Sequence, residues 1–176
     1  MALKIGRYIM ASRQDVGVDP DTLAAQLRIE RETLNNWELD VSHPNMDALL
    51  ALAHVLDIDV RRLVGMKTSR GRSLAHPFAK KDAIQWHHQG SERRQEALSI
   101  VLQMAAGLTA ADKPVHDELS DYYEQLIQER DTRTDMVINA KNMRLGQKMN
   151  EVTITDAMRA DYERLIKLAM ESLSGR

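Results

Sequence analysis

Hydrophobic side chains recur at helical spacing through the first 66 residues. Ile5, Ile9 and Val16 are separated by polar residues, as expected for a helix that buries one face. Gly17 follows them and is suited to a left-handed helix C-cap. The pattern continues and predicts five short helices: one over about residues 3–17, a short second one that includes Leu23, Ala24 and Leu27, and three more over about residues 31–38, 46–56 and 60–63.

Residues suited to helix N-caps precede several of these segments. Asp19 or Asp21 can cap the second helix, whose first turn contains Pro20, and Asp59 can cap the fifth. The helical spacing predicts that the third helix buries Leu34, Trp37 and Glu38, and that the fourth buries Met46, Leu49, Leu50, Ala53 and Leu56.

The composition changes after residue 66. Residues 67–79 are rich in Ser, Arg and Gly and have no hydrophobic period, which is typical of an exposed linker between domains. Residues 80–176 return to helical spacing. We therefore expect two domains, residues 1–66 and 80–176, joined by a linker over 67–79.

The second domain is predicted to be a four- or five-helix bundle. A helix from Ser91 to Gly107 is expected first, and Thr109 begins a second. Two further stripes are predicted to be buried: Leu119, Tyr122, Tyr123, Leu126 and Ile127, and Met158, Tyr162, Leu165, Ile166, Ala169 and Leu173. Thr155 or Asp156 can cap the last helix.

Between those two stripes lies a segment with a weaker pattern, residues 134–149. Met136, Ala140 and Met143 are expected to lie along its buried face, and Gly146 is expected to interrupt its helix. The other methionines of the second half are interpreted as core with some interface.

The composition limits the class of protein. Of the 176 residues 43% are hydrophobic, only 4% are aromatic, and none is cysteine, so disulfides and thiolate zinc sites are excluded. The first residues are too highly charged for a secretory signal, and no run of about eighteen apolar residues occurs. We expect an all-α cytoplasmic protein without a membrane segment.

The charge is unevenly distributed, although the whole chain has a formal net charge of −2. Residues 1–66 carry seven Lys or Arg against ten Asp or Glu, a net charge of −3, whereas residues 67–81 carry five Lys or Arg and no acidic residue. The positive charge that could attract nucleic acid is therefore concentrated in the linker.

The first segment resembles the repressor-like helix-turn-helix family, the phage repressor and Cro class that is also called the XRE family. The resemblance covers roughly residues 5–64, about a third of the chain. The positions that carry it are Ile5, Arg13, Leu23, Ala24, Leu27, Ile29, Leu34, Trp37, Glu38 and Pro44. It implies a five-helix, lambda-repressor-like domain whose third helix enters the major groove of double-stranded DNA.

The resemblance also implies roles for particular residues. Arg13 and Glu38 occupy positions that pair in the family, and we interpret them as structural because a half-buried carboxylate needs a cationic partner. The candidates for DNA contact are Arg31, Glu32, Thr33, Asn35 and Asn36 of the third helix, and Ser42 and His43 of the loop that ends it. Arg can bind guanine, Asn adenine and Glu the amino group of cytosine.

Three positions depart from the family pattern. Pro20 stands where the family usually has Gln, and it cannot supply that side chain's contact to phosphate. Arg28 and Asp40 stand where glycine is usual, and Asp40 would also repel phosphate. Because the domain is acidic, we add Lys67, Arg70 and Arg72 of the linker as candidates for contact with the DNA backbone. A solvated linker without such contacts is the alternative.

Catalytic and metal-binding chemistry is not indicated. The pairs His88 with Glu92 and Asp112 with His116 have helical i, i+4 spacing, but two ligands do not complete a metal site. No nucleotide-binding or hydrolase motif occurs. We expect no enzyme activity, no metal and no cofactor.

The leading hypothesis is a repressor that binds DNA as a homodimer, because two-fold dimers match palindromic operators. The second domain would supply the dimer contacts, and it is also where a small effector or a protein partner could bind. Two alternatives remain: an antitoxin-type protein-interaction module, and a helix-turn-helix adaptor that has lost DNA binding. The operator, the regulated genes and the direction of regulation are not encoded in these patterns.

Overall fold

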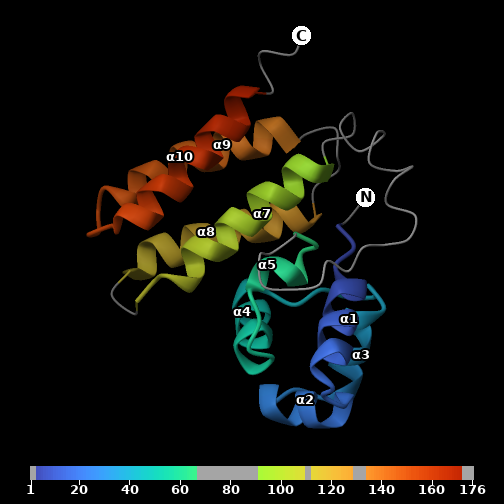
Figure 1. Cartoon of the computed structure of the whole chain (residues 1–176). Helices are drawn as coiled ribbons and strands as arrows, with labels where there is room; N and C mark the ends of the chain where they lie inside the picture. The colour runs from blue at the N-terminus through green and yellow to red at the C-terminus, as the bar shows by residue number, and fades with distance from the viewer. Residues whose placement is uncertain (1–2, 67–90, 110–111, 129–133, 172–176) are drawn as a thin grey trace. The chain divides into compact units, whose positions relative to one another are not determined.

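The structure, a computed structural model, describes residues 3–66, 91–109, 112–128 and 134–171. Every regular element in these ranges is helical, and no strand occurs in them, as the hydrophobic pattern predicts. The chain divides into two compact units (Figure 1), one formed by residues 4–80 and the other by residues 1–3 and 81–176. We call them the first and the second unit.

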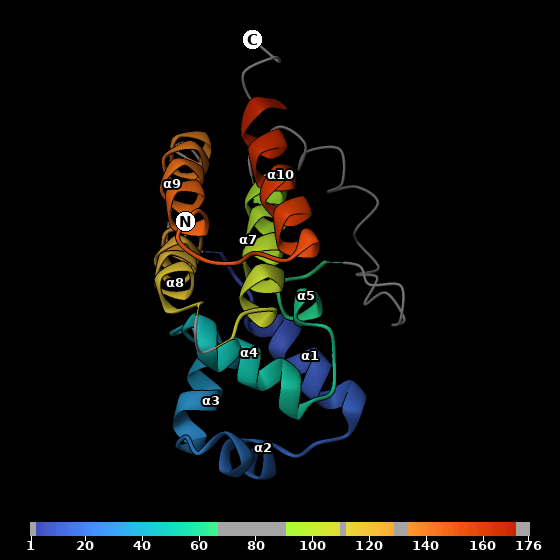
Figure 2. The same cartoon turned by 90° about the vertical axis from the view of Figure 1, so that its left-hand side faces the viewer.

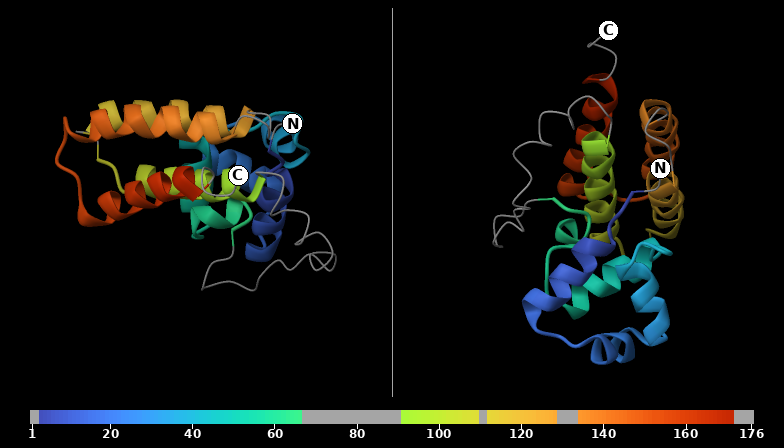
Figure 3. Two further views of the ribbon diagram at one scale, coloured as in Figure 1. Left: turned by 90° about the horizontal axis from the view of Figure 1, so that it is seen from above. Right: turned by 90° about the vertical axis from the view of Figure 1, so that its right-hand side faces the viewer.

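The first unit contains five helices within its described residues: α1 (Gly6–Val16), α2 (Pro20–Leu27), α3 (Arg31–Glu38), α4 (Met46–Val55) and α5 (Val60–Leu63). Helix α1 packs against α3 and α5, and α2 crosses α3 and α4 at one end of the unit (Figure 3, right). Helix α1 begins three residues later than predicted, because Ile5 supplies the carbonyl that accepts its first hydrogen bonds, from Tyr8 and Ile9.

Local interactions at the helix ends explain these bounds. Gly17 has φ 75° and ends α1 in the left-handed conformation, as predicted. Asp19 is the N-cap of α2, because its carboxylate accepts from the backbone N–H groups of Asp21 and Thr22 at 3.0 Å. Asp59 caps α5 in the same way, by accepting from the N–H of Arg61 at 2.9 Å.

The core of the first unit follows the predicted stripes with a few changes. Leu34, Trp37 and Glu38 are buried, as expected. In α4, however, Leu52 is fully buried, whereas Leu50 of the predicted stripe is only half-buried. The unit's buried hydrophobic residues are Ile5, Ile9, Leu23, Ala24, Leu34, Trp37, Met46, Leu49, Leu52, Ala53, Leu56, Val60, Leu63 and Val64.

The second unit is a four-helix bundle within its described residues. Its helices are α7 (Ser91–Ala106), α8 (Lys113–Gln128), α9 (Thr134–Met149) and α10 (Asp156–Glu171). Helices α7 and α9 each pack against both α8 and α10, so the four surround one core (Figure 2). Seen from above, α8 and α9 form one layer, and α7 and α10 form the other (Figure 3, left). The predicted stripe of α8 is fully buried, and Thr155 caps α10 by accepting from the N–H of Met158 at 3.2 Å.

The predicted buried face of α9 is wrong at Ala140 and Met143, and the side chain of Met136, its third residue, lies outside the described part of the structure. Ala140 is exposed, and Met143 is 72% exposed. The face that packs into the bundle consists instead of Ile138, Lys141, Asn142, Leu145 and Met149. Two of these residues are polar, so hydrophobicity alone assigned the wrong face to this helix.

Gly146 does not interrupt α9, contrary to expectation, because the helix continues to Met149. A Cβ atom at Gly146 would overlap the hydroxyl of Tyr162 on α10. That hydroxyl donates to the carbonyl of Asn142 at 3.0 Å. The glycine therefore allows a close approach of two helices.

Candidate nucleic-acid interface

Helices α2 and α3 are joined by a tight turn at Arg28. This residue has φ 56°, a left-handed conformation that glycine adopts more easily than arginine. The N–H groups of Arg28 and Ile29 donate to the carbonyls of Ala25 and Ala24 and so end α2. This short turn therefore restricts the angle between α2 and α3.

Helix α3 has one exposed polar face. Arg31, Glu32 and Asn35 are exposed, whereas Thr33 and Asn36 are half-buried. The opposite side is fixed by Leu34 and Trp37, and by Glu38. A helix that is anchored on one side and polar on the other is suited to insertion into a groove.

The five candidates on α3 are therefore not equivalent. Arg31, Glu32 and Asn35 share the outer face, since they lie at positions i, i+1 and i+4. The carbonyl of Asn36 accepts from the N–H groups of Val41 and Ser42, at 2.9 and 3.2 Å. Asn36 thus also stabilises the turn that ends α3.

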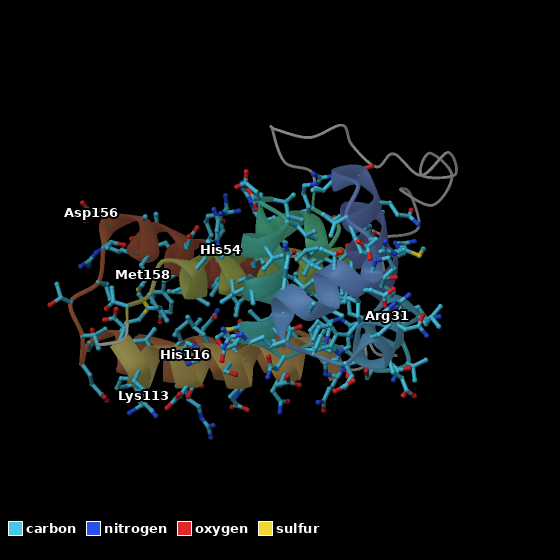
Figure 4. The ribbon with its side chains drawn as sticks, turned by 90° about the horizontal axis from the view of Figure 1, so that it is seen from below. Arg31, His54, Lys113, His116, Asp156 and Met158 are labelled. Atoms are coloured by element: carbon cyan, nitrogen blue, oxygen red, sulfur yellow. The ribbon has the colours of Figure 1, made fainter. Side chains whose placement is uncertain are left out.

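Arg31 has an acidic neighbour that sequence analysis did not identify. Its Nε lies 3.3 Å from Oδ1 of Asp21 on α2, and Figure 4 shows where Arg31 projects from its unit. Both side chains are solvent-exposed, at 42% and 82%, so the ion pair is weak. Asp21 therefore holds the Arg31 guanidinium only weakly.

The remaining candidates lie in the loop after α3 and in the linker. Ser42 is exposed and His43 is half-buried. Pro44 is buried and precedes Asn45, whose side chain caps α4 by accepting from the N–H of Ala48 at 2.8 Å. Lys67, Arg70 and Arg72 lie outside the described residues.

A buried ion pair joins the C-terminal end of α3 to α1. Arg13 donates from Nε to Oε1 of Glu38 at 2.6 Å and from Nη2 to Oε2 at 3.1 Å. Its Nη1 also donates to the carbonyl of Val18 at 3.1 Å. The hydrogen bonds to Glu38 raise the pKa of Arg13, against the opposing effect of burial. This two-bond geometry restricts how α3 can rotate relative to α1.

The comparisons with known proteins agree with this geometry. Residues 9–63, about a third of the chain, match the sequence model of the family described as helix-turn-helix. The first unit is a repressor-like helix-turn-helix domain. No curated protein and no solved structure matches the chain. The family supports a DNA-binding transcription regulator of the XRE type.

Asp40 of the helix-turn-helix domain has a role that its sequence position did not suggest. It has φ 55°, so it adopts the conformation expected where the family usually has glycine. Its Oδ1 accepts a hydrogen bond of 2.7 Å from the N–H of Gly6. The signal in the sequence is that Asp is one of the few residues that tolerate this conformation. This signal is weak, because it does not identify Gly6 as the partner.

Of the two pairs considered for metal binding, only Asp112 with His116 lies wholly within the described residues, and each of these side chains has another neighbour. Asp112 accepts from both the N–H and the hydroxyl of Thr109. His116, which is labelled in Figure 4, has its Nδ1 3.5 Å from Oδ1 of Asp117. His88 lies outside the described residues. No group of three metal-ligating side chains occurs in the part of the chain that the structure describes. None of the described helices is long and apolar enough to cross a membrane.

Proposed function

We propose that this protein is a sequence-specific transcriptional repressor that binds its operator as a homodimer. The observation that carries the proposal is the outer face of α3, where Arg31, Glu32 and Asn35 are exposed while the opposite side is anchored. An anchored helix presents its polar groups in a fixed geometry, which sequence discrimination requires.

Each of these side chains has a base that it fits. Asn35 can form two hydrogen bonds to adenine, Arg31 can form two to guanine after releasing Asp21, and Glu32 can accept from cytosine. Thr33 and Asn36 are half-buried, so their side chains can contact only DNA atoms that lie at the edge of the exposed helix face. The proposed order of importance is therefore Asn35 and Arg31 first, then Glu32.

The second unit is the proposed site of dimerisation. A shallow groove of about 220 Å³ lies between α9 and α10. It is lined by Asn139, Asn142, Met143, Tyr162, Ile166, Ala169 and Met170. None of these is charged, and Met143 and Met170 are 72% and 63% exposed, whereas the centre of a protein interface is typically depleted of charge and enriched in Met. The groove is smaller than the roughly 300 Å³ at which small-molecule pockets begin, which favours a protein surface over a small effector as its partner.

The test is selection of bound duplexes from a random DNA library with the full-length protein. The selection is repeated with Asn35→Ala and with Asn36→Ala, and with Asn150→Ala as a matched control at an exposed position of the second unit. We expect one palindromic sequence to be enriched by the wild type and by the control, and to be lost with Asn35→Ala. Enrichment of no sequence would refute the proposal, and enrichment of a single non-palindromic half-site would refute the dimer.

The linker is proposed to contact the DNA backbone through Lys67, Arg70 and Arg72. The support is electrostatic, because the first 66 residues have a net charge of −3 and the linker holds the nearest excess of cations. Changing all three to Ala should reduce the slope of log K against log salt by about 2.7, which is about 0.9 for each of three phosphates. An unchanged slope would show that the linker is only a spacer.

A second candidate is a helix-turn-helix adaptor that does not bind DNA. It is favoured by the acidic residues beside α3, since Asp21 pairs with Arg31 and Glu30 is exposed. Acidic groups at this position repel phosphate. The DNA selection separates the two candidates, because an adaptor enriches no sequence at any salt concentration.

A further inference from the structure

Asp40 joins two elements that are distant in sequence. It lies in the turn after α3, and its carboxylate accepts from the N–H of Gly6, the first residue of α1, at 2.7 Å. The first N–H groups of a helix have no partner within the helix. Asp40 therefore caps α1 from a position 34 residues away.

The backbone at Gly6 also lies against the end of α3. A Cβ atom at Gly6 would be 2.5 Å from the carbonyl oxygen of Glu38 and would overlap that of Trp37. Only glycine allows this approach. The hydrogen bond from Gly6 to Asp40 thus forms where the two backbones already touch.

Helix α3 is consequently tied to α1 at two points. Arg13 binds the Glu38 side chain in the second half of α1, and Gly6 binds Asp40 at its first residue. One connection limits the distance between two helices, whereas two separated connections also limit their angle. The position of Asn35, one turn before Glu38, depends on that angle.

We propose that Asp40 is a positioning residue for DNA recognition, and that its bond to Gly6 sets the angle at which α3 enters the major groove. The proposal rests on the proposed function, because it concerns how the same helix discriminates sequences. It also changes the interpretation of the Asp40 charge. The carboxylate faces the N-terminal end of α1, whose partial positive charge offsets it, so Asp40 repels phosphate less than its sequence position suggests.

Two substitutions separate the bond from the backbone conformation. Asp40→Asn keeps a side-chain oxygen that can accept from Gly6 and tolerates a positive φ. Asp40→Gly removes the acceptor but adopts the same φ without strain. Asp57→Gly is the matched control, because Asp57 is also exposed, has φ 51°, and follows α4 rather than α3.

The measurement is the affinity of each full-length variant for two duplexes. One is the selected operator, and the other differs from it at the base pair whose selection depends on Asn35. We expect Asp40→Gly to reduce the ratio of the two affinities by about tenfold, the size of one base contact. Asp40→Asn and Asp57→Gly should leave the ratio within about twofold of the wild type. A purely structural role would lower both affinities equally and leave the ratio unchanged, and that result would overturn the proposal.

An NMR measurement without DNA tests the same bond independently. The Gly6 amide should exchange faster in Asp40→Gly than in the wild type and in Asp40→Asn, and the side-chain amide resonance of Asn35 should shift only in Asp40→Gly. If the wild type enriches no duplex but these changes occur, the proposed function fails and the link between Asp40 and α3 stands. If Asp40→Asn behaves like Asp40→Gly, the hydrogen bond is not what positions the helix.

Discussion

In the first unit one buried ion pair joins two helices, whereas in the second unit buried polar side chains form a network across three. Arg13 and Glu38 satisfy each other through two parallel hydrogen bonds. In the second unit, Tyr122 of α8 donates to Asn142 of α9 at 2.9 Å, and Asn142 donates to the carbonyl of Leu165 on α10 at 3.0 Å.

The second unit also distributes its buried charge. The Nζ of Lys141 on α9 binds the carboxylate of Asp121 and lies 3.9 Å from Oε1 of Glu118. Both acidic residues are on α8. Burial raises the pKa of Tyr122 above its ordinary value and so stabilises the protonated hydroxyl that donates to Asn142. The two units therefore differ in how substitutions should affect stability. In the first unit the loss of unfolding free energy is concentrated in the two residues of one charged pair, whereas in the second it is spread over several residues of a network.

The largest expected effect comes from breaking the ion pair. Arg13→Ala leaves the carboxylate of Glu38 buried without its partner and should cost about 3–5 kcal/mol of unfolding free energy. Urea unfolding followed by Trp37 fluorescence, in a Trp86→Phe background, measures the first unit. Replacing both partners, with Arg13→Met and Glu38→Leu, should recover the stability to within about 1 kcal/mol, because no charge is then buried.

The control for this prediction is Arg62→Ala. Arg62 donates to Asp15 at 2.8 Å, but the Asp15 side chain is 45% exposed, so its loss should cost less than about 1 kcal/mol. If Arg13→Ala costs no more than Arg62→Ala, burial does not distinguish the two pairs and the first half of the comparison is wrong.

The network should be less sensitive to any single change. Asn142→Ala removes one bond to Tyr122 and one to the carbonyl of Leu165 and should cost about 2–3 kcal/mol, because both groups lose a partner in the core. Amide hydrogen exchange in α9 and α10 measures this loss of stability. Asn139→Ala, at an exposed position of the same helix, should change stability by less than about 0.5 kcal/mol. A cost for Asn142→Ala above that of Arg13→Ala would reverse the comparison.

The same contrast explains which features the sequence predicts. In the first unit the helices, their caps at Gly17 and Asp59, and the buried side of α3 follow from spacing and local chemistry. Those features depend on residues near one another in the chain. The bond between Asp40 and Gly6 and the ion pair between Asp21 and Arg31 require knowledge of which helices meet.

In the second unit the pattern works for α8 and fails for α9. The buried face of α8 is a continuous stripe of large hydrophobic residues. On α9 the core side includes Lys141 and Asn142, which are buried because α8 and α10 supply their partners, while Met143 is left outside. A pattern based on hydrophobicity cannot identify polar residues that are satisfied by partners on other helices.

The exposed side of α9 leads to the next prediction. If the groove between α9 and α10 is the dimer interface, Met143→Glu places an unpaired carboxylate in it and should weaken dimerisation by at least about tenfold. Sedimentation equilibrium measures the dissociation constant. Gln147→Glu, at an exposed position one turn later, adds the same charge outside the groove and should have little effect. Equal dissociation constants for the two variants would show that the groove between α9 and α10 is not the dimer interface.

The smallest expected effect is the pH dependence of a helix cap in the first unit. The hydrogen bond from the Arg61 side chain lowers the pKa of Asp59, and the N–H of Arg61 lowers it further. A carboxyl whose pKa is lower in the folded state stabilises it above the unfolded pKa of about 4, and that contribution disappears as the pH falls through the folded pKa.

Asp59→Asn keeps an acceptor for the N–H of Arg61 but removes the charge that titrates. Because Asp59 is partly exposed, its contribution at pH 6 should be no more than about 1 kcal/mol. The difference in unfolding free energy between wild type and variant should therefore shrink from pH 6 to about pH 2, since other carboxyls titrate equally in both proteins. A difference that stays constant or grows in acid would mean that the Asp59 cap acts through the shape of its side chain and not through its charge.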